Sequence, residues 1–430
     1  INDFPEISGL IVRIGESDGV DVKDPIHTRL HLTSPGETNA FLRRLIPIFE
    51  EAQRDLILRT WTVGAYPIGD LIWHRQTLAE ALEGIDSSRF IVSMKHGESD
   101  FFRFLPLNKA FFRVSQQTII ELQARREYEG AGECPAPIGR DCERFAKELN
   151  NQDNLVGMSV WCQTGGWHRF RRLSFLEKAG DDSWVRLNVQ LAIGIFRDRL
   201  TTEETLRKHY PDDQAAKVAE LLDHAETVFR DLIYVEEFAK QKLFFRRVRI
   251  PPILHLYWDS LFVNHAVRKL LRHFVSDPER ALKSGEAACS LFPRMQKLAS
   301  ETGLPAEDIE HWRDFCHIMK LARRYYLLPF DPELVESIKA TKAAYKKRWP
   351  RESRERYRIK LSFTPFKMKR RTLAWVSGLL LRRRRGYRMV DQIFTINLLG
   401  MMFRVVRRSN PKALPKFLRK SAMGVETLFR

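Results

Sequence analysis

The chain has 430 residues, of which 44% are hydrophobic and 11% aromatic, and its formal net charge is +18. This composition excludes a disordered chain and supplies enough apolar side chains for a large barrel or for two domains. Residues 341–430 hold 26 Lys and Arg against 4 Asp and Glu, a net of +22, which leaves −4 for the first 340 residues. The basic character therefore belongs to the C-terminal segment and says little about the chemistry upstream.

Five short segments in the first 170 residues predict β-strands, because each begins with an apolar run and ends in polar residues or glycine. They are residues 8–17, 55–64, 89–99, 118–130 and 155–166. Residues 37–53 have helical spacing, with Phe41, Leu45, Ile48 and Phe49 on one face. Alternating strands and helices of this kind are typical of an α/β fold with a parallel sheet.

The pattern changes after about residue 185, where the segments that follow have helical spacing. These segments are residues 185–198, 201–210, 212–232, 267–275, 276–303 and 305–326. The segment 253–260, "ILHLYWDS", is interpreted as packed core rather than as a second site. The C-terminal half is therefore predicted to be mostly α-helical.

The number and spacing of the cysteines argue against a disulfide framework or a zinc site. There are five, Cys134, Cys142, Cys162, Cys289 and Cys316, and no C-x-x-C motif occurs. The sequence also shows no secretory signal and no apolar run of about 18 residues that would span a membrane. We therefore expect a cytoplasmic protein that uses no metal and no cofactor.

Charged and aromatic side chains gather where the predicted strands end. They are Arg13, Glu16, Arg59, Trp61, Lys95, Glu98, Asp100, Arg126, Glu127, Tyr128, Trp161, Gln163, Trp167 and His168. The carboxyl ends of parallel strands carry the chemistry of barrel enzymes. Separated carboxylates suit glycosidic cleavage, indole faces stack on sugar rings, and arginines bind carboxylates. The alternative is a charged rim whose groups pair with one another.

Several of these motifs occur in an order and spacing that resemble the α-glucuronidase family of glycoside hydrolases. The chain has "VRIGESDG" where the family has V-K-A-N-S-E-G, and "LRTWTV" where it has W-R-A-F-V. It has "KHGESDF" for K-N-G-P-I-D-F and "LQARREY" for Q-I-T-Q-E-Y. The resemblance covers roughly residues 5–210. It implies an inverting hydrolase that removes a glucuronic-type acid from an oligo- or polysaccharide such as a xylan fragment.

The resemblance also implies individual roles. Glu16 matches the general acid, whereas Asp100 and Glu127 match the two carboxylates that position and deprotonate the attacking water. Arg59 matches the arginine that binds the uronate carboxylate, and Arg13 stands near a carboxylate-binding lysine. The full substrate-binding set predicted here is Arg13, Arg59, Trp61, Lys95, Tyr128, Trp161 and Trp167. The replacement of the family's last motif by "WCQTGGWHRF" means that xylan need not be the substrate.

The fold implied by the resemblance is the C-terminal part of a (β/α)8 TIM-type barrel, incomplete or open, followed by a mostly α-helical domain. The predicted divisions are residues 1–200 for the barrel half, 201–340 for the helical domain and 341–430 for the basic helical segment. The partner expected is a uronic-acid-containing glycan. A homodimer through the helical domain and weak contact with an anionic membrane surface are further partner predictions, and nucleic acid is not expected.

The same residues are also compatible with purely structural roles. Glu16 could be a loop acid, Asp100 could cap the following segment, and Glu127 could pair with Arg125 or Arg126. Arg59 could be a counterion inside a barrel. At the level of function, the alternative is a non-catalytic relative that uses its basic segment to associate with an anionic surface or polysaccharide. In that segment, the apolar sides of the helices could equally pack on the rest of the protein.

Overall fold

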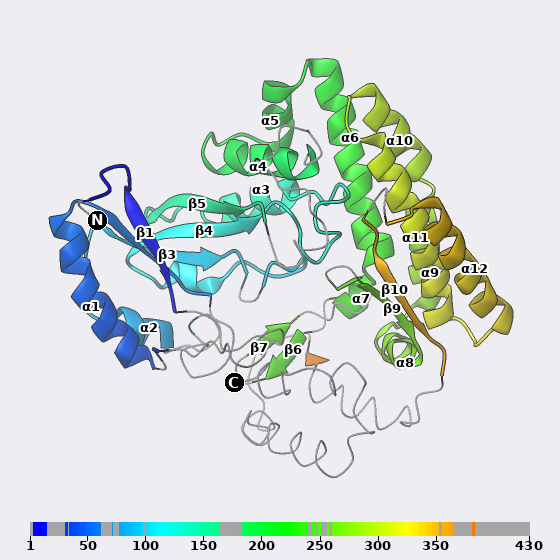
Figure 1. Ribbon diagram of the computed structural model, residues 1–430, viewed down its shortest axis with the longest axis horizontal. Coiled ribbons are helices and arrows are strands. Elements are labelled where there is room, and N and C mark those ends of the chain that lie inside the picture. The colour runs from blue at the N-terminus through cyan, green and yellow to red at the C-terminus, as the bar shows by residue number, and fades with distance from the viewer. Residues whose placement is uncertain are drawn as a thin grey trace, which may run out of the picture.

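The protein is a mixed α/β molecule in which a parallel sheet stands beside a large group of helices (Figure 1). The computed structural model describes residues 3–14, 31–32, 34–61, 71, 77–97, 100–163, 175, 183–239, 242–245, 248–250, 256–257, 260–351, 355–364 and 381–382. The five predicted strands are confirmed, as is the largely helical character of the chain after residue 185.

The main sheet contains five strands in strict sequence order, and every neighbouring pair is parallel. The strands are β1 (Gly9–Arg13), β2 (Asp55–Arg59), β3 (Phe90–Lys95), β4 (Gln117–Gln123) and β5 (Leu155–Trp161). The register pairs Arg13 with Arg59 and Lys95 with Glu121. Since all strands run in one direction, their carboxyl ends meet at one edge, and the side chains that follow them are brought together there.

Helices connect consecutive strands. They are α1 (Pro35–Glu51), α2 (Thr77–Leu82), the 3-10 turn Lys109–Phe112 and α3 (Gly139–Glu148). A capping box of Ser34 and Glu37 starts α1. Of the predicted face of α1, Phe49 is buried and Leu45 is partly buried against the core, whereas Phe41 and Ile48 are exposed. The other buried residues of the helix are Thr38, Leu42 and Ile46. The helix is rotated by about one residue because Leu42, Ile46 and Phe49 form an equally regular apolar stripe.

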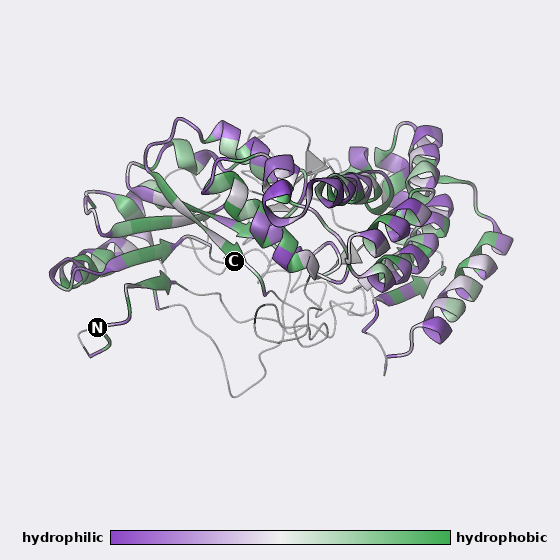
Figure 2. Ribbon diagram, turned by 90° about the horizontal axis from the view of Figure 1, so that it is seen from above, coloured by the Kyte–Doolittle hydropathy of each residue, from purple (hydrophilic) through white to green (hydrophobic). Residues whose placement is uncertain are grey.

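The two faces of the sheet differ in chemistry. Alternate residues of β2, β3 and β4 form an apolar face, namely Leu56, Leu58, Phe90, Val92, Met94, Ile120 and Leu122, all at most 2% exposed. The residues between them, toward the carboxyl ends, are the buried polar side chains Arg59, Ser93, Lys95, Glu121 and Gln123. Alternation along a strand places these two sets on opposite faces. Seen from above, the strands are coloured mostly as hydrophobic (Figure 2).

The helical region is built around α11 (Ala306–Leu327), which packs against α8 (His265–Phe274), α9 (Pro278–Cys289), α10 (Phe292–Glu301) and α12 (Pro332–Arg348). It begins with α4 (Ser183–Phe196), α5 (Thr202–His209), α6 (Asp212–Val228), the π-helical turn Phe229–Ile233 and α7 (Glu236–Ala239). The segment 276–303, predicted to be helical, contains two helices: α9 ends at Cys289, and α10 begins at Phe292 with Pro293 in its first turn, where a proline is favoured.

Two small sheets accompany these helices. One orders β10 (Arg358–Ser362), β9 (Ser260–Asn264) and β8 (Leu256–Tyr257), and the other orders β11 (Leu381–Arg382), β6 (Lys242–Phe245) and β7 (Val248–Ile250). The boundary predicted at residue 341 falls inside α12, and β10 pairs in parallel with β9. Part of the basic segment is therefore integrated with the helical region. Of the helices within the described ranges, none has the length and apolarity needed to span a membrane.

Candidate functional site

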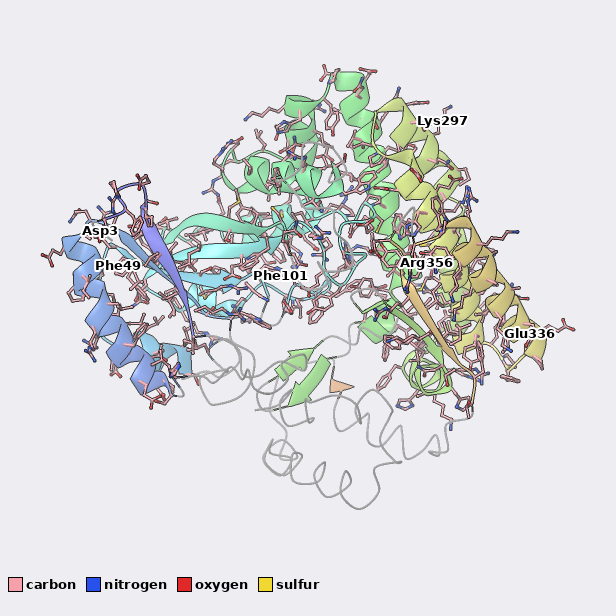
Figure 3. All side chains as sticks on the ribbon, in the orientation of Figure 1. Asp3, Phe49, Phe101, Lys297, Glu336 and Arg356 are labelled. Carbon is pink, nitrogen blue, oxygen red and sulfur yellow. The ribbon has the colours of Figure 1, made fainter. Side chains whose placement is uncertain are left out.

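The carboxyl edge of the sheet brings together Lys95, Asp100 and Tyr128, which follow or end the neighbouring strands β3 and β4. Lys95 forms an ion pair with Asp100 Oδ1, and the Tyr128 hydroxyl donates a hydrogen bond to Asp100 Oδ2 at 2.5 Å. The backbone N–H of Phe101 donates to Asp100 Oδ1 at 2.9 Å. Figure 3 labels Phe101 in this loop, between the sheet and the long helices. Three donors therefore hold the Asp100 carboxylate in place.

This arrangement favours an ionised Asp100. Burial raises the pKa of Asp100, but the Lys95 ammonium and the hydrogen bonds from Lys95, Tyr128 and Phe101 outweigh it and leave the pKa below its ordinary value. Burial lowers the pKa of Lys95, and Asp100 opposes that shift. The Asp100 carboxylate therefore stays ionised at the edge of the sheet, and its basicity is lower than that of an ordinary carboxylate.

Aromatic rings enclose the Lys95 ammonium. Its nitrogen lies 3.7 Å from the centroid of the Trp61 ring and 4.2 Å from that of Phe101. Arg13, at the end of β1, donates from Nε to the backbone oxygen of Trp61 at 3.3 Å. The predicted residues Arg13, Trp61 and Lys95 are therefore connected, and the Trp61 indole is committed to a cation–π contact.

Arg59 lies in a second buried cluster on the same polar face. Its Nε donates to both oxygens of Glu121 at 3.0 and 3.1 Å, and the Ser93 hydroxyl donates to Glu121 Oε1 at 2.7 Å. The guanidinium carbon lies 4.1 Å from the centroid of the Trp161 ring. Arg59 is thus a counterion in the sheet interior. Among the described residues, none accepts a hydrogen bond from its Nη atoms.

Glu127 stands at the end of β4 and is half-buried. Its carboxylate accepts a hydrogen bond from Gln123 Nε2 at 3.3 Å, and its backbone N–H donates to Gln123 Oε1 at 2.7 Å. The two neighbouring arginines are directed elsewhere: Arg125 donates to Gln163 and Ala131, and Arg126 pairs with Glu129. Glu127 and Asp100 lie at the same edge, because Tyr128 directly follows Glu127 and bonds to Asp100.

Sequence reasoning missed a group of buried charges directly behind this edge. Arg103 donates to Glu129 through Nε and Nη2, at 2.9 and 2.8 Å, and also forms an ion pair with Glu226 of α6. Arg126 and the Tyr234 hydroxyl donate to the same Glu129 carboxylate. Burial raises the pKa of Glu129, but Arg103 and Arg126 outweigh it and lower the pKa to about 2. The signal in the sequence was Glu129 itself, two residues after Glu127.

Glu121 was also missed. It was visible in the sequence as a single acid within the apolar segment "TIIELQ", where a charge needs a buried partner. Two predicted site residues, Glu16 and Trp167, lie outside the described residues, as do Glu98 and His168. The structure therefore brings together Arg13, Arg59, Trp61, Lys95, Asp100, Glu127, Tyr128 and Trp161 at or near one edge of the sheet.

Two further hydrogen-bond donors at this edge are buried without a partner within the described residues, Trp161 Nε1 and Gln163 Nε2. Arg125 Nη1 donates to Gln163 Oε1 at 2.8 Å, which fixes the orientation of that amide. Buried donors are usually paired in folded proteins. Trp161 lies next to Arg59. This end of the edge is therefore polar and holds donors that have no acceptor among the described residues.

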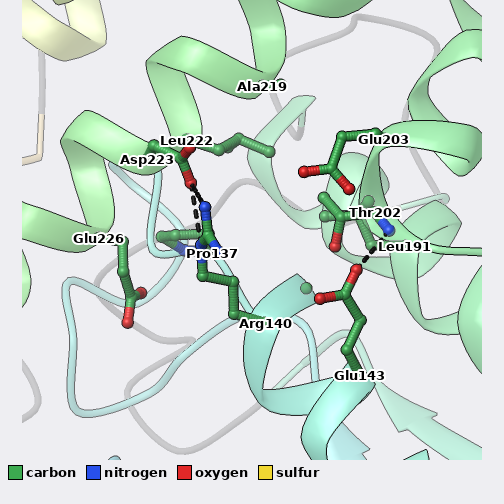
Figure 4. A pocket seen from close by; sticks show the side chains of 11 residues that line it. Pro137, Arg140, Glu143, Leu191, Thr202, Glu203, Ala219, Leu222, Asp223 and Glu226 are labelled. Carbon is green, nitrogen blue, oxygen red and sulfur yellow. Dashed lines mark hydrogen bonds and ion pairs between the residues drawn. The ribbon is translucent and has the colours of Figure 1, made fainter.

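A separate pocket, which is open to solvent, lies between α3, α4, α5 and α6 (Figure 4). Several of its polar groups already have partners: Arg140 donates to Asp223 at 3.0 Å, and Glu143 accepts the backbone N–H of Thr202 at 2.6 Å. Apolar lining comes from Pro137, Leu191, Ala219 and Leu222. These contacts join helices, so the pocket is a weaker candidate than the sheet edge.

Comparison with known proteins adds no relationship. No protein-family model matches the chain, and no curated protein matches it. In the part of the chain that the structure describes, no group of three or more His, Cys, Asp and Glu side chains is placed to hold a metal ion.

Proposed function

We propose that the protein is a glycoside hydrolase that removes an α-linked uronic acid from an oligo- or polysaccharide by an inverting mechanism. The observation that carries this proposal is that β3 and β4 deliver Asp100 and Glu127 to one edge, where the hydroxyl of Tyr128 binds Asp100. Two carboxylates in different environments can take different roles in acid–base catalysis. The resemblance to α-glucuronidases assigns the same two positions to activation of the attacking water.

The environments suggest how the two carboxylates divide the work. Asp100 is bound by a cation and two further donors, which lower its pKa, so it is a weak proton acceptor and orients the water. The resemblance names Glu127 as the second carboxylate beside the attacking water. We assign proton abstraction to Glu127, and protonation of the leaving oxygen to Glu16 by resemblance. Inverting enzymes place acid and base about 6.5–9.5 Å apart, which leaves room for the water.

The choice of a uronic acid is supported by the cations at the same edge. Among the described residues, none accepts a hydrogen bond from the Nη atoms of Arg59. Arg13 lies at the end of the adjacent strand, β1. A guanidinium binds a carboxylate through paired N–H donors. The unpartnered donors of Trp161 and Gln163 would suit the oxygens of a sugar. The Trp161 ring, stacked by Arg59, borders the same place.

We also propose that the five strands are part of a (β/α)8 barrel. A doubly wound sheet reverses its strand order, whereas these strands follow one another without reversal. Right-handed crossovers in such a sequence place the connecting helices on one face. The other face carries buried Arg59, Ser93, Lys95 and Glu121, as the lining of a barrel would.

The second candidate is a non-catalytic protein of related fold that associates with an anionic surface or polysaccharide. One observation favours it: Arg59 pairs with Glu121, and Lys95 pairs with Asp100. These charged groups at the sheet edge therefore neutralise one another without a substrate. Most of the basic segment 341–430, on which this candidate depends, lies outside the described residues. Activity measurements separate the two candidates directly.

The test is hydrolysis of α-linked glucuronide oligosaccharides by the full chain, followed by ¹H NMR of the first anomer released. We expect the β-anomer first, as inversion of an α-linkage requires. Glu127→Gln should reduce kcat by about 10²–10⁴-fold, the usual contribution of a general base. The matched control is Asp153→Asn, an exposed acid before β5 at the opposite end of the sheet, which should retain full activity.

Two results would overturn the proposal. One is the absence of hydrolysis across a panel of uronic-acid-containing glycans, and the other is retained activity in Glu127→Gln. Binding of the same glycans without turnover would support the non-catalytic candidate. Release of the α-anomer first would leave a glycosidase but reject the inverting mechanism.

A further inference from the structure

The backbone of Arg126, directly before Glu127, has a left-handed conformation that is unusual for a residue with a side chain. Its φ is 52°, and Ala131 in the same loop also has φ 52°. Such conformations persist where surrounding contacts enforce them, and they concentrate at functional sites. The direction in which the chain leaves β4, and with it the position of Glu127 and Tyr128, therefore depends on what holds Arg126.

The contacts that hold Arg126 converge on Glu129. The Arg126 guanidinium donates to Glu129 Oε2 through Nε and Nη2 at 2.9 and 2.8 Å. The backbone N–H groups of Glu129 and Ala131 donate to the Arg126 oxygen at 2.9 and 3.2 Å. The loop thus closes on itself around Arg126. The Glu129 carboxylate is the point through which this turn is attached to the rest of the protein.

Side chains of the helical region complete this attachment. The Tyr234 hydroxyl donates to Glu129 Oε1 at 2.8 Å, across 105 residues of sequence. Tyr357 donates to the backbone oxygen of Gly130 at 3.0 Å. Asn188 of α4 donates to the backbone oxygens of Ala124 and Ala136 at 2.8 and 2.9 Å. Three distant parts of the helical region therefore hold the loop that carries Glu127.

Tyr234 is itself fixed by an unusual turn. It directly follows the π-helical turn Phe229–Ile233, and Arg323 of α11 donates from Nη1 to the backbone oxygens of Asp231, Leu232 and Tyr234. The last two distances are 2.9 and 3.2 Å. Here the turn ends α6 at the place where Tyr234 meets Glu129.

We propose that Tyr234 is a positioning residue for the catalytic loop, acting through Glu129 and Arg126 on Glu127 and Tyr128. The helical region is then a working part of the site and not an independent appendage. The kinetic part of this inference rests on the function proposed above. The structural part, that Tyr234 fixes the loop after β4, does not depend on any activity.

The experiment compares Tyr234→Phe with Tyr326→Phe in the full chain. Tyr326 is a matched control, because it is a buried tyrosine of the helical region whose hydroxyl donates to the backbone oxygen of Phe262 at 2.7 Å. Amide hydrogen exchange is measured at Glu129 and Ala131, whose N–H groups bond to Arg126. In Tyr234→Phe we expect their exchange to accelerate about tenfold, the equivalent of one buried hydrogen bond, and not in the control.

Kinetics on a glucuronide provide the second measurement. Tyr234→Phe should lower kcat by about tenfold with little change in KM, since a misplaced base affects the transition state more than substrate binding. Equal exchange at the two amides in both variants would overturn the positioning role. So would acceleration spread evenly over the sheet and helices, which marks general destabilisation. A wild-type chain without hydrolysis would reject the proposed function, while the exchange result would still decide the role of Tyr234.

Discussion

The hydroxyl of Tyr128 lies 2.5 Å from Asp100 Oδ2 and joins the loop after β4 to the loop after β3. The Tyr128 ring lies against Phe102, with centroids 4.4 Å apart, so the ring would stay in place without its hydroxyl. The oxygen of one tyrosine thereby sets the distance between two elements that each carry a proposed catalytic carboxylate. Its removal separates the electrostatic role of the hydroxyl from the packing role of the ring.

We predict that Tyr128→Phe raises the pKa of Asp100. The hydroxyl is one of the donors that lower this pKa, and its loss leaves burial, which raises it, less opposed. If Asp100 must be ionised, the acidic limb of the kcat/KM profile moves to higher pH. Carboxyl ¹³C NMR reads the same shift without substrate. An unchanged titration of Asp100 would show that Tyr128 does not stabilise its charge.

We predict that Arg59→Lys reduces the preference for a glucuronide over the matching glucoside by about 10–100-fold. Lysine retains a charge for Glu121 but loses the paired N–H donors that suit a carboxylate. The measurement is the ratio of kcat/KM for the two substrates. Arg89→Lys is the control, since Arg89 pairs with Asp55 at the opposite end of the strands and should leave the ratio unchanged. Equal turnover of both substrates by the wild-type chain would contradict the assignment.

We predict that the stability of the protein depends on pH through His96, a buried histidine. Burial, with Arg126 nearby, lowers the pKa of His96 to about 4 from 6.5, and its ring lies 5.0 Å from that of Phe145. The unfolded chain therefore binds a proton as the pH falls below 6.5, while the folded chain resists protonation until about pH 4. The contribution of neutral His96 to the free energy of unfolding is therefore complete above pH 6.5. It is lost as the pH falls from 6.5 to about 4, by up to about 3 kcal/mol.

Urea unfolding at several pH values measures the pH dependence of stability that we attribute to His96. In His96→Phe, which keeps a ring and removes the titration, the midpoint should fall less steeply from pH 6.5 to 4 than in the wild type. The exposed His209→Gln variant controls for the loss of a histidine. Parallel curves for wild type and His96→Phe would refute the prediction.

Two glycines in helices predict opposite effects of alanine. A Cβ at Gly194 in α4 would lie 2.1 Å from Thr205 Oγ1 of α5, and Thr205 is fully buried. We expect Gly194→Ala to destabilise the protein by about 1–3 kcal/mol through overpacking, despite the better helix propensity. Gly36 in α1 has no atom within 4 Å of such a Cβ, so Gly36→Ala should be neutral or stabilising by up to about 1 kcal/mol. Thermal unfolding of both variants decides, and similar effects in both would contradict the packing argument.

The sequence was a good guide to the strands and a poor one to the partners of their charges. Apolar starts and polar ends located all five strands, because buried parallel strands require that pattern. It could not show that Arg126 pairs with Glu129 rather than with Glu127, since both acids lie within reach along the chain. The pairing of Glu129 with Tyr234 spans 105 residues and has no local signature. The face of α1 was misjudged because the helix has two apolar stripes, and only packing selects one.

The first strand of the sheet, β1, is one of its two edge strands, and β5 is the other. β1 is bonded to β2 alone in the described sheet, and its Leu10 and Ile11 are 42% and 61% exposed. Strands with few buried contacts open at low free-energy cost, so the backbone amides of β1 should exchange faster than those of β3. Arg13, which contacts Trp61, lies at the end of this edge strand. A ligand that engages Arg13 would slow the exchange of β1, and occupancy of the edge and protection of the strand would rise together.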